Sequence, residues 1–273
     1  MSSISPEMQE IKEKMKATWA TGDFGVIAKI IEDEGRNFIN RLNIKPGDKV
    51  LDIACGNGNL SIPAAKLGAV VTGIDIVPDL IRQARQKSKT EGLNIQFDEG
   101  DAEAMPYKDN EFDTVVSMFG IMFAPRPDAA ASEMLRVCKP GGRIAMANWT
   151  PEGFTGKMFK LSASHVPPPH GVPPPVLWGN EETAKQRLGD RVSNLKLKRV
   201  MLRENIPMSP PDVVEHFRQY FGPTQRTFMA LDEEGQKKLR QDTIELWEKY
   251  NIAKDGTTMV DAEYLEVIAT KIS

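Results

Sequence analysis

The sequence predicts a doubly wound α/β fold built on a mostly parallel sheet, and three observations support this prediction. Between residues 49 and 148, short apolar runs alternate with amphipathic segments, which is typical of strands joined by helical crossovers. The apolar runs lack strict alternation of apolar and polar residues, as expected of strands covered on both faces. The chain has 273 residues, 40% of them apolar and 27% charged, which is enough for one large domain with additions.

The predicted core contains five strands and three helices. In chain order the strands are KVLDI, AVVTGI, NIQFDE, DTVVSMF and RIAMAN. The helices are expected at about 60–67, 78–91 and 128–137, where apolar residues recur at helical spacing.

Further helices and strands are predicted on either side of this core. In the first 45 residues, a break at Thr21-Gly22-Asp23 divides two helices, with Asp23 as the N-cap of the second. Six prolines within 167–175 exclude a helix, so this segment is predicted to be a rigid connector or, alternatively, the edge of a pocket. Later elements are predicted as strands at 194–205 and 264–272 and as helices at 211–230 and 232–250.

Charge and cysteine content limit the classes of function. The formal charge is −3 and the basic residues are scattered, so we expect no nucleic-acid partner. Cys55 and Cys138 lack metal-ligand spacing, which indicates a reducing compartment and argues against a metal site. No signal peptide and no apolar run long enough to span a membrane is present, so we expect a cytoplasmic protein without an integral membrane segment.

The segment VLDIACGNG, residues 50–58, predicts a ligand-binding loop. It connects the first strand to a helix, at the edge where open parallel sheets bind ligands. Gly56 and Gly58 permit unusual backbone angles and leave room for a ligand. Asp75 ends the second strand, 19 residues after Gly56, where a carboxylate accepts hydrogen bonds from ribose hydroxyls. We favour this role over that of a helix cap, which we assign to Asp79.

Both a dinucleotide and an adenosyl sulfonium fit such a loop, and three features favour the sulfonium. Ser61 occupies the place of the third glycine in the pyrophosphate fingerprint. Asp52 would repel a pyrophosphate but attract the ammonium of a methionyl group. Asp101 follows the third strand, where it can accept a hydrogen bond from an adenine amino group, with the Ala102 amide available to a ring nitrogen.

The motifs VLDIACGNG, GIDI, EGDAEAMPY, EFDTVVSMF and LRVCKPGGRI, in this order, resemble those of class I S-adenosylmethionine-dependent methyltransferases. The likeness is strongest to the group akin to the ubiquinone/menaquinone-biosynthesis methyltransferases and covers about residues 48–150. It implies a Rossmann-like, seven-stranded sheet with an antiparallel last strand, and S-adenosyl-L-methionine as cofactor, with S-adenosyl-L-homocysteine as product. Ala54 stands where the family commonly has glycine, and we expect a negative φ there.

The resemblance also implies site residues. The methionyl and ribose part of the cofactor would contact Asp52, Ala54, Cys55, Gly56, Asn57 and Gly58. Asp75 would hold the ribose. Ile76 and Leu80 would pack on the adenine, Asp101 and Ala102 would read its edge, and Ser117 and Met118 would lie beneath the sulfonium. Beside the cofactor we expect the aromatic residues Trp19 and Phe24. On the acceptor side we expect Phe119, Met122, Phe123, Trp149 and Phe154.

The predicted organisation is a methyltransferase domain at 46–206 and 251–273, a helical lid at 1–45 and a helical cap inserted at 207–250. The predicted activity is direct in-line transfer of a methyl group to a small, apolar or aromatic acceptor. The alternatives are a cofactor-binding protein that acts on a macromolecule or transfers nothing, and a dinucleotide-binding dehydrogenase. The sequence assigns no catalytic residue, since His165, His170 and His216 are candidates by residue type alone.

Overall fold

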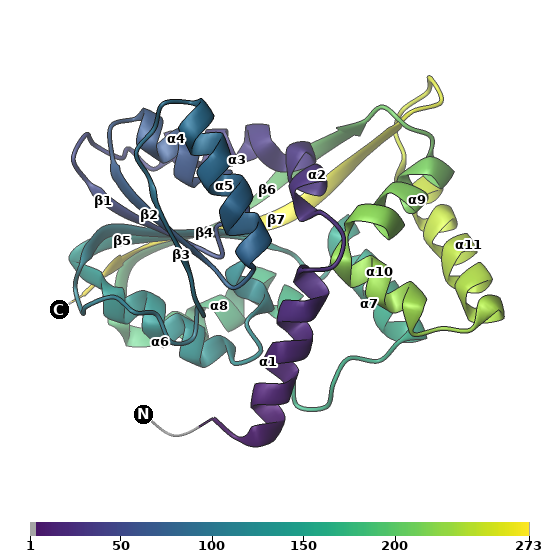
Figure 1. The fold of residues 1–273 in the computed structure, drawn as a ribbon, viewed down its shortest axis with the longest axis horizontal. Coiled ribbons are helices and arrows are strands. Elements are labelled where there is room, and N and C mark those ends of the chain that lie inside the picture. The colour runs from purple at the N-terminus through teal and green to yellow at the C-terminus, as the bar shows by residue number, and fades with distance from the viewer. Residues whose placement is uncertain (1–3, 273) are drawn as a thin grey trace.

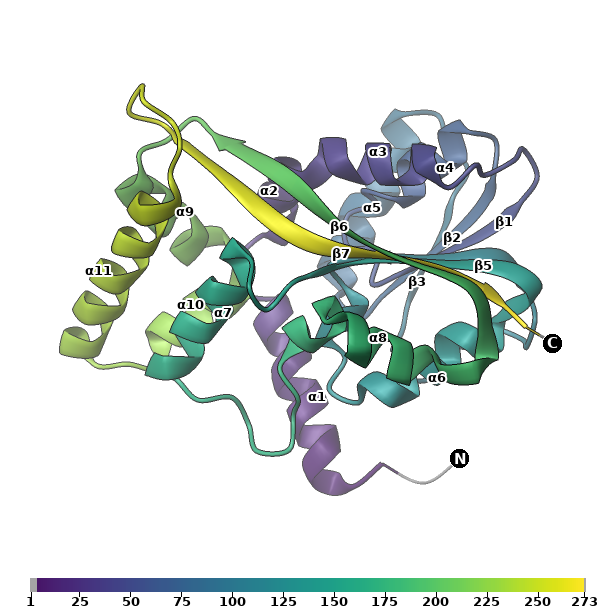
Figure 2. The same ribbon diagram turned by 180° about the vertical axis from the view of Figure 1, so that it is seen from behind.

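The computed structural model describes residues 4–272, which form a seven-stranded sheet flanked by helices (Figures 1 and 2). The strand order is β3-β2-β1-β4-β5-β7-β6. Neighbouring strands are parallel from β3 to β5, and β7 is antiparallel to both β5 and β6. The strands are β1 (Lys49–Ile53), β2 (Val70–Asp75), β3 (Gln96–Glu99), β4 (Phe112–Met118), β5 (Cys138–Trp149), β6 (Val192–Ile206) and β7 (Thr258–Lys271). The predicted doubly wound, Rossmann-like fold is confirmed.

Helices cover both faces of the parallel part of the sheet (Figures 1 and 2). One face carries α3 (Glu32–Arg41), α4 (Ser61–Lys66) and α5 (Pro78–Thr90), and the other carries α6 (Pro127–Val137) and α8 (Glu181–Leu188). Because both faces are covered, Val50, Leu51 and Ile53 of β1 have no exposed surface. The strand-order reversal between β1 and β4 marks the edge where ligands bind in folds of this kind.

The antiparallel pair β6–β7 extends beyond the rest of the sheet, and four helices gather beside its far end (Figure 1). These helices are α7 (Phe154–His165), α9 (Pro210–Tyr220), α10 (Gly222–Met229) and α11 (Glu233–Tyr250). Apolar side chains of α7, α9 and α11, together with the far end of β6 and β7, form a second core around Phe154, Val214 and Trp247, apart from the main core under the sheet. This part of the chain therefore has a packing centre of its own.

The N-terminal segment contains α1 (Pro6–Trp19) and α2 (Phe24–Ala28), with a 3₁₀ turn, Lys29–Ile31, before α3. Asp23 caps α2 as predicted, because its side chain accepts a hydrogen bond from the Gly25 amide. The predicted second helix is interrupted, since the Glu32 amide bonds to the Lys29 carbonyl. The Ala28 carbonyl, freed in this way, accepts a hydrogen bond of 2.8 Å from Asn59 Nδ2 instead.

Outside the core further elements differ from the prediction. Neither α7 nor α8 was predicted, and β7 begins at Thr258, earlier than expected. The predicted helix at 211–230 is divided into α9 and α10 at Phe221, whose backbone is extended. Pro223, in the first turn of α10, lacks the amide that would continue α9. Among residues 4–272, no helix combines the length and the apolar character needed to cross a bilayer.

Candidate functional site

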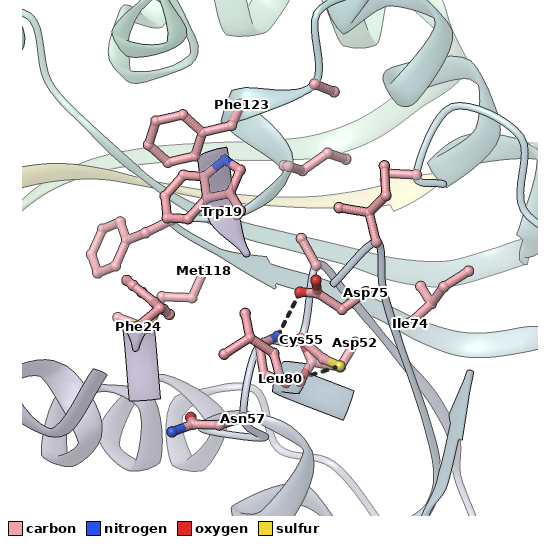
Figure 3. Close-up of a pocket in the computed structure, with 18 of the residues that line it drawn as sticks. Trp19, Phe24, Asp52, Cys55, Asn57, Ile74, Asp75, Leu80, Met118 and Phe123 are labelled. Carbon is pink, nitrogen blue, oxygen red and sulfur yellow. Dashed lines mark hydrogen bonds between the residues drawn. The ribbon is translucent and has the colours of Figure 1, made fainter. Parts of the chain in front are cut away.

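A cavity of about 1000 Å³, partly open to solvent, lies at the carboxyl ends of the parallel strands (Figure 3). Its walls also include Met15 and Trp19 of α1 and Phe24 and Ala28 of α2. Thirteen of the fifteen predicted cofactor residues line it: Trp19, Phe24, Asp52, Ala54, Cys55, Gly56, Asn57, Asp75, Ile76, Leu80, Asp101, Ala102 and Met118. Sequence reasoning did not name other parts of the wall, among them Asn59, Gly120, Ile121, Ala124 and Pro125.

The loop after β1 takes the left-handed conformation at three of its residues. The φ angles are 53° at Ala54, 54° at Gly56 and 93° at Gly58. The expectation of a negative φ at Ala54 is therefore wrong, and alanine here carries strain that glycine would not. Gly120, after β4, makes room for it, since a Cβ on Gly120 would lie 2.6 Å from the Ala54 Cβ.

The Cys55 side chain lies behind the loop, in a small apolar cluster with Ile81, Ala84 and Phe97. Burial raises the pKa of its thiol well above the usual value. A Cβ on Gly73 would lie 2.9 Å from the Cys55 sulfur, so glycine at this position of β2 lets the sulfur pack against the strand. The cluster packs the loop against α5 and β3.

Asp75 holds the loop and the start of α5 together. Its Oδ2 accepts a hydrogen bond of 2.8 Å from the Gly56 amide, drawn dashed in Figure 3, and its Oδ1 accepts one of 2.9 Å from the Val77 amide. The assignment of the capping role to Asp79 is wrong, because Asp79 pairs with Arg82 on the surface. The Asp75 carboxylate lines the cavity and retains lone pairs for ribose hydroxyls.

Asp52 is 1% exposed, and its Oδ2 accepts a hydrogen bond of 2.6 Å from Ser61 Oγ. Ser61, at the place of the missing third glycine, thus donates its hydrogen bond to the Asp52 carboxyl group rather than to a phosphate. Burial raises the pKa of Asp52 to about 7, and the nearby Asp75 contributes in the same direction.

Asp101 has a partner that sequence reasoning missed. Lys12 of α1, 5% exposed, forms ion pairs with Asp101 Oδ2 and, at 2.6 Å, with Glu103 Oε2. Glu103 also accepts a hydrogen bond of 2.6 Å from Arg126 Nε. The signal for Lys12 was its place between Met8 and Met15 in the apolar stripe of the helix.

Three predicted residues lie outside the walls that they were expected to form. Ser117 is buried, where its Oγ donates 2.7 Å to the Ile53 carbonyl and accepts 3.0 Å from the Ile121 amide. Gly58 faces Ile62 and Phe97, and Met122 is 2% exposed within the main core. Ser117 instead ties β1 to the turn after β4.

A second cavity, of about 600 Å³, adjoins the first. Both are lined by Trp19, Phe24, Ile31, Phe119 and Phe123, which form a shared wall. Four of the five predicted acceptor residues line the second cavity: Phe119, Phe123, Trp149 and Phe154. The rings of Phe119 and Trp149 stack at 3.7 Å with an interplanar angle of 4°, so this part of the wall is rigid.

Glu204 of β6 also lines the second cavity and was missed. The signal was the alternation Leu202, Glu204, Ile206, which directs all three side chains to the buried side of the strand. A charged residue in such a row is unusual.

None of the histidines lines either cavity. His165 bonds to Asp242 at 2.8 Å, His170 is exposed in the proline segment, and His216 packs beside Tyr220. The residues between 166 and 175 line neither cavity, and Trp178 after them is fully buried in the main core. The proline segment therefore connects α7 to the core.

The chemistry of the first cavity fits an adenosyl sulfonium better than a pyrophosphate. Asp52, Asp75 and Asp101 line it, and no lysine, arginine or histidine does within residues 4–272. Carboxylates attract a cation and repel phosphates. Trp19 and Phe123, which line both cavities, pack edge to face at 4.8 Å (Figure 3).

Known proteins resemble the chain in sequence and in structure. Residues 50–142 match a family model described as "Methyltransferase domain". An uncharacterized protein of Mycobacterium tuberculosis is 36% identical over 269 residues, 97% of each chain. Demethylmenaquinone methyltransferase of Deinococcus radiodurans is 38% identical over 128 residues, 45% of this chain and 53% of the relative.

A solved structure of Haemonchus contortus phosphoethanolamine N-methyltransferase 2, in complex with phosphomonomethylethanolamine and S-adenosylhomocysteine, has the same fold. The TM-score is 0.55 at 20% identity, covering 88% of this chain and 53% of the other. Together with the ordered motifs and the strand order, these similarities settle the family. The chain belongs to the class I S-adenosylmethionine-dependent methyltransferases, in the group that resembles the ubiquinone/menaquinone-biosynthesis enzymes.

Proposed function

We propose that this methyltransferase acts on a small, apolar or aromatic acceptor, which enters the second cavity. One observation carries the proposal: an acidic cavity suited to the cofactor adjoins an aromatic cavity across a shared wall. The name of the Deinococcus radiodurans relative, a demethylmenaquinone methyltransferase, is compatible with an apolar aromatic acceptor.

The residues that line the first cavity have complementary roles in this proposal. Asp75 holds the ribose hydroxyls, Asp52 attracts the methionyl ammonium, and Asp101 accepts a hydrogen bond from the adenine amino group. Leu80 and Ile76 pack on the adenine ring. When bound, S-adenosylmethionine supplies a methyl group on a positively charged sulfur, which is a good leaving group.

The chain's own contribution is alignment of the acceptor and exclusion of water. Proximity and orientation supply about 7–11 kcal/mol in favourable cases, so direct displacement needs no covalent intermediate with the protein. Phe119 lines both cavities, and its ring is fixed against Trp149. We propose that this pair orients the acceptor.

We also propose that the N-terminal helices and the 207–250 segment close over the site together. The Asp23 amide donates a 3.0 Å hydrogen bond to the Tyr220 carbonyl, and Gly22 forms a β-bridge with Phe221. Phe38 and Ile39 of α3 belong to the main core, so the closing part of the predicted lid ends before α3. α7 packs with α11 in the second core, which extends the predicted cap.

The test is transfer of a labelled methyl group from S-adenosylmethionine into a bacterial extract. We expect label in organic-extractable small molecules. Label confined to precipitable polymer would favour the alternative of a macromolecular acceptor, and binding of S-adenosylhomocysteine without transfer would favour a binding protein. We propose a cytoplasmic location, because Cys55 and Cys138 are both free and buried.

A further inference from the structure

The second cavity contains a carboxyl group that the proposed function does not use. Glu204 is 6% exposed, and Thr155 and Phe217 line the same cavity. Within residues 4–272 its carboxyl group has no hydrogen-bond or ion-pair partner. Burial alone raises its pKa to about 7, and no neighbouring group opposes this shift.

An unpartnered carboxyl group in an apolar cavity costs folding free energy. An acid with a perturbed pKa in a cleft is a candidate functional group. Leucine at position 204 would match Leu202 and Ile206 on the same face of β6 and would carry no such cost. The Glu204 carboxylate therefore requires a ligand that compensates its negative charge.

The rest of the wall defines the chemistry of that ligand. Nine of the fifteen lining residues are aromatic, and Glu204 is the single ionisable one. Aromatic faces and a carboxylate both attract a cation, whereas no basic side chain of the wall would hold a phosphate or a carboxylate. A neutral ligand would leave the charge of Glu204 uncompensated.

We infer that the second cavity binds an amine, an acceptor with an apolar or aromatic body whose single ammonium group lies against Glu204. The inference rests on the proposed function and narrows its acceptor class. Glu204 is a residue that selects and positions the acceptor. Phe119, Trp149 and the other rings pack on the apolar body.

The test uses three probes of equal length: 4-phenylbutylamine, 4-phenylbutan-1-ol and 4-phenylbutyrate. Each is titrated calorimetrically at pH 8 into protein saturated with S-adenosylhomocysteine, which occupies the first cavity. We expect the amine to bind about tenfold or more tightly than the alcohol, and the acid to bind most weakly, since a desolvated charge pair discriminates strongly. Equal affinities for amine and alcohol, or no binding of the amine at millimolar concentration, would overturn the inference.

Glu204→Gln keeps the shape of the side chain and removes its charge. It should reduce the preference for amine over alcohol to within about twofold and leave the affinity for the alcohol nearly unchanged. Glu245→Gln, an exposed site on α11, makes the same change of net charge and should preserve the preference. An amine preference that persists in Glu204→Gln contradicts the inference.

Binding of S-adenosylhomocysteine is measured separately in every variant. If the unmodified protein does not bind S-adenosylhomocysteine, this result contradicts the proposed function itself. Normal binding together with an absent amine preference counts against the role of Glu204 alone.

Discussion

Two strained residues meet at the site. Ala54 and Phe119 have φ angles of 53° and 55°, a region that costs an L-residue about 1–2 kcal/mol. Gly120 brings the two turns together, because a Cβ there would collide with Ala54. Such strain concentrates at functional sites, where the surrounding structure enforces it.

Replacing Ala54 with glycine should stabilise the protein. Relief of the left-handed strain exceeds the extra entropy of glycine in the unfolded chain, so we expect the unfolding free energy to rise by up to about 1 kcal/mol. Urea denaturation measures this unfolding free energy. Ala17→Gly, at an exposed position inside α1, should instead lower it by about 0.5–1 kcal/mol. A destabilised Ala54→Gly variant would show that the alanine methyl group contributes packing that outweighs the strain.

Glu204 should make stability depend on pH. Its folded pKa of about 7 lies above the usual 4.5, so the folded state holds the proton more tightly than the unfolded state. Its destabilising effect is absent below pH 4.5, grows between pH 4.5 and about 7, and is complete above that. We expect Glu204→Gln to raise the unfolding free energy by about 2 kcal/mol more at pH 8 than at pH 5.5. Urea denaturation at the two pH values tests this, and an equal gain at both would contradict the shifted pKa.

At the scale of elements, a buried charge cluster attaches α1 to the part of the first cavity that Asp101 lines. Lys12 bridges Asp101 and Glu103, and Glu103 also binds Arg126. Removing one member of such a cluster leaves uncompensated buried charge. The position of α1 and the binding of the cofactor should therefore depend on one another.

Lys12→Met should detach α1 while keeping the helix apolar stripe. We expect amide hydrogen exchange in α1 to accelerate about tenfold or more, because the helix loses its main polar anchor. The affinity for S-adenosylhomocysteine should fall in parallel. Lys14→Met removes an exposed surface pair, with Lys14 71% exposed, and should change neither quantity. Unchanged exchange in Lys12→Met would show that apolar contacts alone hold α1.

At the scale of the whole molecule, the N-terminal helices and the far helices are joined. A Cβ on Gly222 of α10 would lie 2.0 Å from the Thr18 carbonyl oxygen of α1, so the backbones are in direct contact. Trp19 packs edge to face on Phe221 at 5.6 Å. Segments distant in sequence thus form one side of the site.

Binding of S-adenosylhomocysteine should protect both segments at once. We expect hydrogen exchange to slow in 6–28 and in 210–229 together, since the two are linked across Gly22 and Phe221. Mass spectrometry with peptide resolution measures this. Protection confined to the loop at 52–58 would contradict joint closure.

The core was predictable from the sequence because its strands and helices follow simple periodicities. The glycine loop and the carboxylates after β1, β2 and β3 could be found because parallel strands present their carboxyl ends at one edge. Ala54 could not be predicted, since its φ depends on Gly120, which is remote in sequence. Lys12 was overlooked because its acidic partners, Asp101 and Glu103, lie far from α1 in the sequence. Glu204 was overlooked because the alternation in 194–205 identifies a strand but does not reveal the cavity beside it, whose other walls come from segments distant in sequence.

The central claim is that the first cavity binds S-adenosylmethionine through Asp75, and calorimetry with S-adenosylhomocysteine and with NAD tests it most directly. We predict binding of S-adenosylhomocysteine and none of NAD. Asp75→Ala should weaken binding by about tenfold or more, from the loss of hydrogen bonds to a charged group, whereas Asp79→Ala on the surface should not. Binding of NAD instead, or an Asp75→Ala affinity within about twofold of the unmodified protein, would contradict the account.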